Sequence, residues 1–356
     1  MKSEVDTAVM KRTVVGAGLL ALDVLVQAES DTAEHHAAGG SFGNVMAILA
    51  WLGWRAVPFA RLGEDNAADA VIADLSYRGV ITDGIHRCSK SNTPIIVHRY
   101  GLGSPEHPRH RFEWVCPSCH RWLPRYVPIP KRNLPTADAL DKAEICYIDR
   151  ATPGTLALAT LAKANGAIVI FEPPKLTDDP VASACLRICD ILKYSLEYGG
   201  RRNSSSEVQP PLEIVSLGGD GLRYRLNGFL GMRQEWMSQE APALEGSRDF
   251  AGCGDWLSAG FLHAIRCSSE VTLESVDGAL KYGQALAAMN SLAVGARGLM
   301  ALADRDKVTD MACAFSEGGR FQKPKLHTSQ TSVMNWHRCV TCGGNQIEVK
   351  APQMPR

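Results

Sequence analysis

Along most of the chain, short apolar runs alternate with segments whose apolar residues recur at helical spacing. Residues 13–18 (TVVGAG) show the pattern of a buried strand, and residues 43–52 (GNVMAILAWL) show that of a helix. The alternation continues through residues 143–148, 155–164, 167–171, 181–188, 190–194 and 212–217. Such a pattern predicts an α/β fold with a mostly parallel central sheet and helices on both faces.

Two regions interrupt this alternation. Residues 101–134 are rich in Pro, His, Arg and Trp, which is typical of an inserted lid or loop, and from about residue 316 the chain becomes polar and irregular. The part of the insertion at residues 108–126 is basic and aromatic, a composition that can bind single-stranded nucleic acid. We favour its role as the edge of a lid, because the chain as a whole has no basic excess.

The overall composition narrows the classes of function. Lys+Arg and Asp+Glu both number 38, so no global positive field exists to hold nucleic acid or an anionic membrane. No run of about 18 apolar residues could cross a bilayer, and residues 1–13 lack a signal core. We therefore expect a cytoplasmic protein with no membrane partner, in which the eleven cysteines form no disulfide framework.

The segment most indicative of chemistry is residues 249–261 (DFAGCGDWLSAGF). Two glycines flank Cys253 and a helical pattern follows, so backbone N–H groups would converge on one point at the positive end of a helix. Asp255 would then lie beside a bound anion, where it could accept a hydroxyl proton during phosphoryl transfer. The alternative is an ordinary capping aspartate. The helix start also predicts a lowered pKa for the Cys253 thiol.

Five short motifs resemble, in order, the signatures of the PfkB/ribokinase family of sugar and nucleoside kinases. They are residues 18–23 (GLLALD), 39–44 (GGSFGN), 61–65 (RLGED), 216–221 (SLGGDG) and 249–255 (DFAGCGD). Phe250 and Cys253 depart from the family's D-T-x-G-A-G-D pattern, but both glycines and the final aspartate are kept. The resemblance covers about residues 11–305.

This resemblance implies a ribokinase-like three-layer fold with a small β lid. The kinase domain would span residues 11–310, with lid segments near 20–38 and 93–113. Independently of the resemblance, residues 114–125 and 335–346, which hold two C-x-x-C pairs, would form a zinc-knuckle insertion and tail, and residues 311–356 an irregular extension. The resemblance also leaves open a homodimer formed through the lid.

By the same resemblance, the chain is an ATP-dependent kinase that phosphorylates a hydroxyl of a sugar or nucleoside-like substrate. Asp255 is then the catalytic base. The other implied site residues are an anion hole of Ala251, Gly252, Cys253 and Gly254, substrate contacts at Asp23, Gly39, Gly40 and Asn44, and ATP contacts at Ser216, Gly218, Gly221 and Asn290. The family's N-x-x-E motif appears as residues 194–197 (YSLE), so only Glu197 remains to organise Mg²⁺ through water.

Three alternatives stay open or are set aside. The missing asparagine and Phe250 would suit a catalytically weak sensor that binds a sugar or nucleotide. A zinc-containing module that binds nucleic acid or protein could also be carried on the kinase fold. Residues 16–21 (GAGLLA) satisfy the G-x-G-x-x-A dinucleotide fingerprint, but residues 20–27 continue as a strand where that site requires a helix, so we reject an NAD enzyme.

Two C-x-x-C pairs predict a structural zinc site. Cys116 with Cys119, and Cys339 with Cys342, could together supply four thiolates to one tetrahedral Zn²⁺. Both pairs fall in the regions that interrupt the α/β pattern, so a shared ion would order both at once. Substitute ligands are available at His110, His120 and His337, although surface exposure is the simpler role for each.

Overall fold

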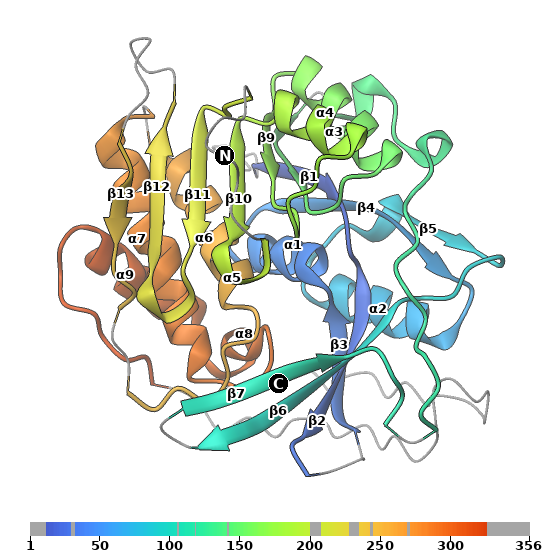
Figure 1. Ribbon diagram of the computed structural model, residues 1–356, viewed down its shortest axis with the longest axis horizontal. Coiled ribbons are helices and arrows are strands. Elements are labelled where there is room, and N and C mark those ends of the chain that lie inside the picture. Colours follow the sequence, from blue (N-terminus) through green and yellow to red (C-terminus); the bar gives the residue numbers. More distant parts are fainter. Residues whose placement is uncertain are drawn as a thin grey trace, which may run out of the picture.

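The computed structural model describes residues 12–29, 33–104, 107–117, 119–140, 142–199, 208–227, 235–242, 245–268 and 271–325. Within these residues, nine strands form the central sheet in the order β13-β12-β11-β10-β9-β8-β1-β4-β5 (Figure 1). Their bounds, in that order, are Met237–Gln239, Leu222–Leu226, Leu212–Ser216, Ile191–Ser195, Ile168–Phe171, Ala143–Ile148, Thr13–Ala17, Arg55–Gly63 and Ile85–Cys88. Neighbours pair in parallel, except that β12 and β13 add an antiparallel edge. The predicted mostly parallel sheet is confirmed.

Helices cover both faces of this sheet. Successive side chains of a strand point to opposite faces, and in the central strands the residues on both faces are apolar. Val14 packs with α1 (Ser41–Trp51), α2 (Asn66–Tyr77), α6 (Cys253–Cys267) and α7 (Leu273–Ser291), in one core cluster. Its neighbour Val15 belongs to a second cluster with α3 (Pro153–Ala164) and α4 (Pro180–Ile188) on the opposite face. The predicted three-layer fold is therefore confirmed. No helix among the described residues is long and apolar enough to cross a membrane.

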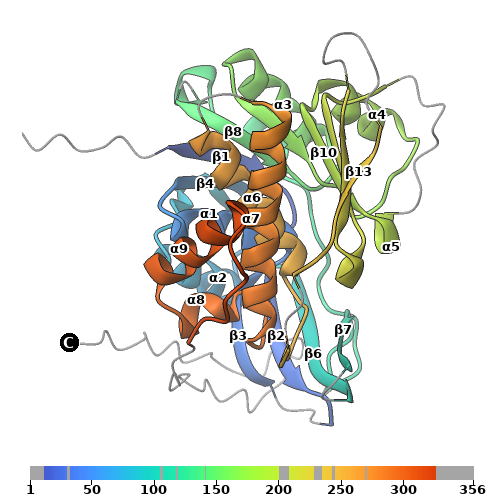
Figure 2. The same cartoon turned by 90° about the vertical axis from the view of Figure 1, so that its left-hand side faces the viewer.

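A separate four-stranded sheet forms the lid, in the order β3-β2-β6-β7 (Figure 2). The strands are β2 (Ala21–Gln27), β3 (Ala33–Gly39), β6 (Ile95–Ser104) and β7 (His107–Glu113). Leu22, Val24 and Val97 belong to the same core cluster as α2. In the strand register, Asp23, Leu25 and His98 belong to the opposite face of the lid. The carboxylate of Asp74 on α2 fixes β3, because it accepts hydrogen bonds from the Ala38 amide (3.0 Å) and from Arg297 (2.7 Å).

The C-terminal boundary differs from the prediction. Residues 311–316, expected to be irregular, belong to helix α9 (Arg305–Ser316). Val308 and Ala312 on this helix are fully buried and join the main core cluster. Apolar residues at helical spacing were present there, but the surrounding charges obscured them. Among the described residues there are also two short α-helices, α5 (Leu196–Gly199) and α8 (Gly298–Leu302).

Candidate active site

Two glycines bring the lid and the start of α1 into close contact. A Cβ atom on Gly39 would lie 2.0 Å from Asp23 Cγ, so only glycine fits beside this carboxylate. Gly40 has φ 76°, a left-handed conformation that glycine adopts without strain. The Gly40 amide hydrogen-bonds Asp23. The Gly-Gly pair thus places the Asp23 carboxylate at the beginning of α1.

Two buried oxygen atoms at this place lack hydrogen-bond partners. They are Oδ1 of Asp23 and Oδ1 of Asn44, whose residues are 7% and 4% exposed. Burial raises the pKa of Asp23 to about 6, although His98, Arg297 and the Gly40 amide act in the opposite direction. Buried polar atoms are nearly always hydrogen-bonded, and leaving one unpaired costs about 1–3 kcal/mol. Both oxygens are therefore suited to accept hydrogen bonds from hydroxyl groups of a ligand.

Asp255 lies in the first turn of α6, next to this point. The helix begins after Gly252, which has φ 75° and whose added Cβ would lie 2.3 Å from Ala296 O. The Asn44 side-chain amide donates a 2.8 Å hydrogen bond to Asp255 Oδ2. Asn44 therefore holds the Asp255 carboxylate with its nitrogen while its oxygen remains available. The structure brings together Asp23, Gly39, Gly40, Asn44 and Asp255, five residues that sequence analysis selected.

A polar network beneath Asp255 was not predicted. Glu172 follows β9 directly and forms an ion pair with Lys193 of β10, whose side chain is only 2% exposed. Tyr147 and Ser258 both donate to Glu172 Oε2, at 3.1 and 2.5 Å. Lys193 Nζ also donates to the carbonyl of Gly254, at 3.3 Å. The Lys193–Glu172 ion pair therefore lies under the glycine turn and supports it from below.

This environment raises the pKa of Asp255 well above that of an ordinary aspartate. Burial is the largest cause, followed by the negative charge of Glu172. The hydrogen bond from Asn44 and the charge of Lys193 lower the pKa and only partly offset these effects. A carboxylate with a raised pKa is a stronger base near neutral pH than an exposed one. The site can thus remove a proton from a weakly acidic group.

A second carboxylate that the sequence analysis missed, Asp149, organises the start of α1. It follows β8, and its side chain is completely buried. Oδ2 accepts hydrogen bonds from Ser41 Oγ (2.5 Å) and the Phe42 amide (3.0 Å), while Oδ1 accepts one from the Leu19 amide (2.9 Å). Asp149 and Glu172 both lie at carboxyl ends of parallel strands, where ligands of open α/β sheets bind. That rule was the available signal for both.

The glycine turn itself differs in two details from what we expected. The Ala251 amide donates to Asp249 Oδ1 (3.0 Å), so it is already engaged within the protein. The amides of Gly254 and Asp255 remain at the helix start, where N–H groups have no partner within the helix. The prediction of a lowered Cys253 pKa was wrong. Burial and the charges of Asp249 and Asp255 raise the pKa of this thiol to about 12, which outweighs the helix terminus.

The expected nucleotide loop forms a turn, but Asn290 does not support the predicted contact. Ser216 ends β11, Gly218 has φ 63° and Gly221 has φ 94°. Asn290 on α7 is completely buried, where its Nδ2 donates to Ala251 O and its Oδ1 accepts from Leu299 N, both at 3.2 Å. Its side chain therefore holds the glycine turn, with neither end offered to an adenine ring. Glu197 is exposed on α5, directly after β10.

A pocket of about 420 Å³ adjoins the start of α1. Its walls include Leu19, Trp114, Trp122, Tyr126 and Arg150. Leu19 connects this pocket to the site, because its carbonyl accepts a 3.3 Å hydrogen bond from the Gly43 amide of α1. Trp122 is 67% exposed, and the Arg125 guanidinium carbon lies 4.9 Å from the centre of the Trp122 ring. The pocket can accommodate a flat or apolar group.

Half of the predicted Cys₄ zinc site can be described. Cys116 is buried and Cys119 half-buried, in a tight turn where the His120 amide donates to Cys116 O at 2.9 Å. His120 has φ 55°, as expected in such a turn. Cys339, Cys342 and His337 lie outside the described residues. The shared zinc site therefore stays a prediction.

Comparison with known proteins identifies relatives of this arrangement. Residues 18–99 match the model of the pfkB family carbohydrate kinases. The fold is similar to an uncharacterized sugar kinase from Pyrococcus horikoshii, with 18% identity over 85% of this chain and 99% of that one (TM-score 0.64). It is also similar to Arabidopsis thaliana ribokinase solved with ribose and ATP. The identity is 19% over 85% of this chain and 99% of that one, and the TM-score is 0.62. For aminoimidazole riboside kinase from Salmonella enterica, the identity is 17% over 85% of this chain and 100% of that one, with a TM-score of 0.64. No curated protein matches the sequence. The predicted family resemblance is confirmed.

Proposed function

From the family match and the shared fold, we propose that this protein is a kinase that transfers the γ-phosphoryl group of ATP to a hydroxyl of a sugar or nucleoside-like substrate. The observation that carries the proposal is the Asn44–Asp255 hydrogen bond beside two unpartnered buried oxygens, Asp23 Oδ1 and Asn44 Oδ1. A base and two hydrogen-bond acceptors in one place suit a substrate with several hydroxyl groups. One hydroxyl would react while the others fix its orientation.

In the proposed mechanism, the substrate hydroxyl donates its proton to Asp255 as its oxygen attacks the γ-phosphorus in line. Asp23 and Asn44 hold neighbouring hydroxyls, and the amides of Gly254 and Asp255 face the transferred group. Lys193, paired with Glu172, holds the turn from below through the Gly254 carbonyl. Fixed donors and charges of this kind stabilise the charge that develops on the phosphoryl oxygens.

ATP would lie along residues 216–221, and Mg²⁺ would accompany it. Glu197 is an exposed carboxylate at the carboxyl end of β10 and fits an ion that keeps most of its waters. When bound, Mg²⁺ would offset negative charge on the phosphates. The carboxylate of Glu172 is engaged by Lys193, Tyr147 and Ser258, which makes it a support for the site and a poorer direct ligand.

The pocket beside α1 favours a substrate that carries a ring or another flat group next to its hydroxyls. Trp114, Trp122 and Tyr126 offer aromatic faces, and Arg150 offers a positive charge that is paired with Asp149. A nucleoside-like compound would place its base there and its sugar against Asp23 and Asn44. Stacking on such rings contributes about 1–3 kcal/mol per base.

A mixed panel of sugars and nucleosides, incubated with ATP and Mg²⁺, tests this proposal. Mass spectrometry of the products should show one compound class gaining a phosphoryl group, with ADP formed in equal amount. If ATP binds but no compound in the panel is phosphorylated, the chain acts as a sensor on this fold. A low-salt filter-binding assay with single-stranded nucleic acid tests the remaining alternative, for which we expect no retention.

A further inference from the structure

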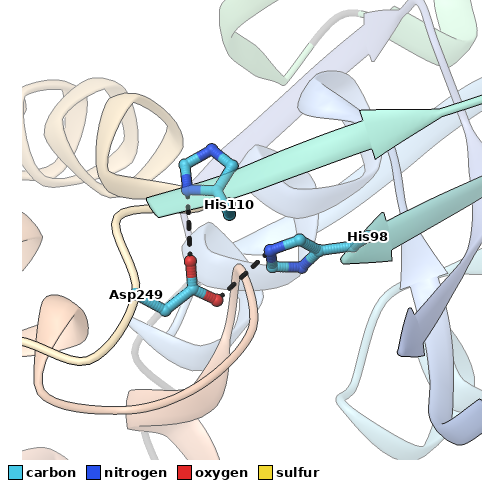
Figure 3. A group of neighbouring side chains, drawn as sticks. All are labelled: His98, His110 and Asp249. Atoms are coloured by element: carbon cyan, nitrogen blue, oxygen red, sulfur yellow. Dashed lines mark ion pairs between the residues drawn. The ribbon is translucent and has the colours of Figure 1, made fainter. Parts of the chain in front are cut away.

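Three side chains from separate elements converge at the other end of the glycine turn. His98 lies on β6 and His110 on β7 of the lid, and Asp249 precedes the turn in the body of the protein (Figure 3). The side chains of His98 and Asp249 are 1% and 0% exposed, whereas His110 is 20% exposed. None of these three side chains has a part in the proposed phosphoryl transfer. Their convergence therefore needs another explanation.

The separations within this group match those between ligands of one small metal ion. His98 Nε2 lies 3.3 Å from Asp249 Oδ2, and His110 Nδ1 lies 3.3 Å from Asp249 Oδ1. With metal–ligand bonds of about 2.0–2.1 Å, neighbouring ligands of a tetrahedral Zn²⁺ are about 3.3–3.4 Å apart. The two contacts end on different oxygens of one carboxylate, as they would around an ion that this carboxylate chelates. All the candidate ligand atoms lie within 4.8 Å of one another.

Hydrogen bonding alone leaves this group incomplete. Although buried His98 Nε2 lies within ion-pair distance of Asp249 Oδ2, it makes no hydrogen bond of normal geometry. The two Asp249 oxygens, in contrast, are each fixed by a backbone amide, Oδ1 by Ala251 (3.0 Å) and Oδ2 by Gly295 (2.8 Å). Metal-binding carboxylates are typically held by such outer hydrogen bonds. An unsatisfied imidazole that faces a pre-oriented carboxylate indicates a missing partner between them.

We propose that His98, His110 and Asp249 form a site for a transition-metal ion, with Zn²⁺ as the ion that fits best. Two imidazoles and one carboxylate suit Zn²⁺, whereas Mg²⁺ prefers oxygen ligands and six-fold geometry. The partial exposure of His110 leaves a route by which the ion can enter. The ion would join lid strands β6 and β7 to the turn that leads to Asp255. Its presence would therefore favour the closed arrangement of the lid over the catalytic turn.

Zinc binding must be measured without interference from the C-x-x-C pairs. A background variant with Cys116→Ser and Cys339→Ser breaks each pair while keeping the full chain. After removal of metal with a chelator, this variant should bind about one Zn²⁺ per chain. With Co²⁺ in place of Zn²⁺, the visible spectrum should show bands of a nitrogen and oxygen site and lack the intense thiolate band. No substrate is needed, so the result is independent of the proposed kinase activity.

Ligand variants in the same background identify the site. His110→Gln should weaken Zn²⁺ binding by more than the 10- to 100-fold typical of an outer-sphere partner. His98→Gln should do the same, but since His98 is buried and its variant could fail to fold, His110→Gln carries the test. His86→Gln, an exposed histidine on β5, should bind zinc like the background variant. Zinc should slow proteolysis of the lid in the background variant and leave it unchanged in His110→Gln.

Two results would overturn the proposal. One is the absence of stoichiometric zinc binding in the background variant. The other is binding by His110→Gln that is as tight as in the background variant. Either result would leave a metal-free contact between the lid and Asp249, and neither would bear on whether the protein is a kinase.

Discussion

Asp249 and Asp255 lie at the two ends of one short turn, and their surroundings have opposite effects on them. Burial alone would raise the pKa of Asp249, but contacts with His110 and His98 and the Ala251 amide hold it below its ordinary value. For Asp255, burial and the charge of Glu172 raise the pKa far more than Asn44 and Lys193 lower it. The protein therefore favours the ionised form of Asp249 and disfavours that of Asp255.

The difference assigns the two ends of the turn different roles. Asp249 accepts hydrogen bonds from Ala251 and Gly295 and so fixes the loop in place. Asn44 donates a hydrogen bond to one oxygen of Asp255, but the folded protein still disfavours the ionised form of this carboxylate. A residue of the first kind should matter for stability, and one of the second kind for chemistry. The following predictions test that separation, from the largest expected effect to the smallest.

Replacing Asp255 by Asn should produce the largest loss of activity. The amide can still accept the Asn44 hydrogen bond but cannot take a proton, so kcat should fall by about 10²-fold or more. Steady-state kinetics with the substrate found in the panel measures this, and ATP affinity should change little. Asp306→Asn, exposed on α9, is the matched control and should retain full activity. A kcat within a few-fold of the parent for Asp255→Asn would contradict the assignment of the base.

The same variant should be more stable than the parent at neutral pH. Since folding raises the pKa of Asp255, the folded state binds more protons than the unfolded state between the ordinary and the raised pKa. That carboxylate therefore costs stability as pH rises through this interval, and Asn removes the cost. Thermal unfolding should show little difference between the two proteins below about pH 4 and a growing advantage for Asp255→Asn as the pH rises above that value.

Replacing Asp249 by Asn should instead reduce stability. The Asn side chain has one acceptor oxygen and one NH₂ group. The backbone N–H of either Ala251 or Gly295 would therefore face that NH₂ group and lose its hydrogen bond. The free energy of unfolding should fall by about 1–3 kcal/mol. Denaturant unfolding measures this. Asp179→Asn is the control, because Asp179 caps the N-terminus of α4 and Asn is an equally good capping residue. Equal stability of Asp249→Asn and the parent would remove the anchoring role.

Two changes beneath Asp255 should move its pKa in opposite directions. Glu172→Gln removes a negative charge that raises this pKa, so the acid limb of the pH profile of kcat/KM should shift to lower pH. Lys193→Met removes a positive charge that lowers it, so the limb should shift to higher pH. Shifts in the same direction for both variants would show that Asp255 does not control the limb.

Trp122→Ala tests the pocket and should have the smallest effect. Loss of an exposed aromatic face should raise KM for a ring-bearing substrate about 3- to 30-fold, equivalent to about 0.7–2 kcal/mol, and leave kcat nearly unchanged. KM for a simple sugar should not respond. Trp51→Phe, which changes a partly buried ring on α1 outside the pocket, is a control for general loss of packing.

The sequence predicted those parts of the fold and site that depend on local pattern. Apolar periodicity located most central strands and helices, and short motifs located Asp23, Asn44 and Asp255. Glu172 and Lys193 escaped because they are 21 residues apart and meet only through the pairing of β9 with β10. Asp149 escaped for the same reason. Order within a parallel sheet is a tertiary property that no single segment encodes.

The remaining misses came from burial and from contacts between distant segments, neither of which a local pattern reveals. The helix terminus alone lowers a thiol pKa, but Cys253 is enclosed near two carboxylates and its pKa rises. Asn290 was expected to contact ATP, yet both ends of its side-chain amide make hydrogen bonds within the protein. His98 and His110 were not connected, since their approach depends on the register of β6 with β7 and on the position of Asp249.

The most direct test of the central claim is transfer of label from γ-labelled ATP to the hydroxyl substrate, compared between the parent and Asp255→Asn. We predict a labelled product with the parent, and at least about 10²-fold slower labelling with Asp255→Asn at unchanged ATP binding. Equal rates of labelling in the two proteins would contradict the account. So would a parent that binds ATP yet labels no sugar or nucleoside.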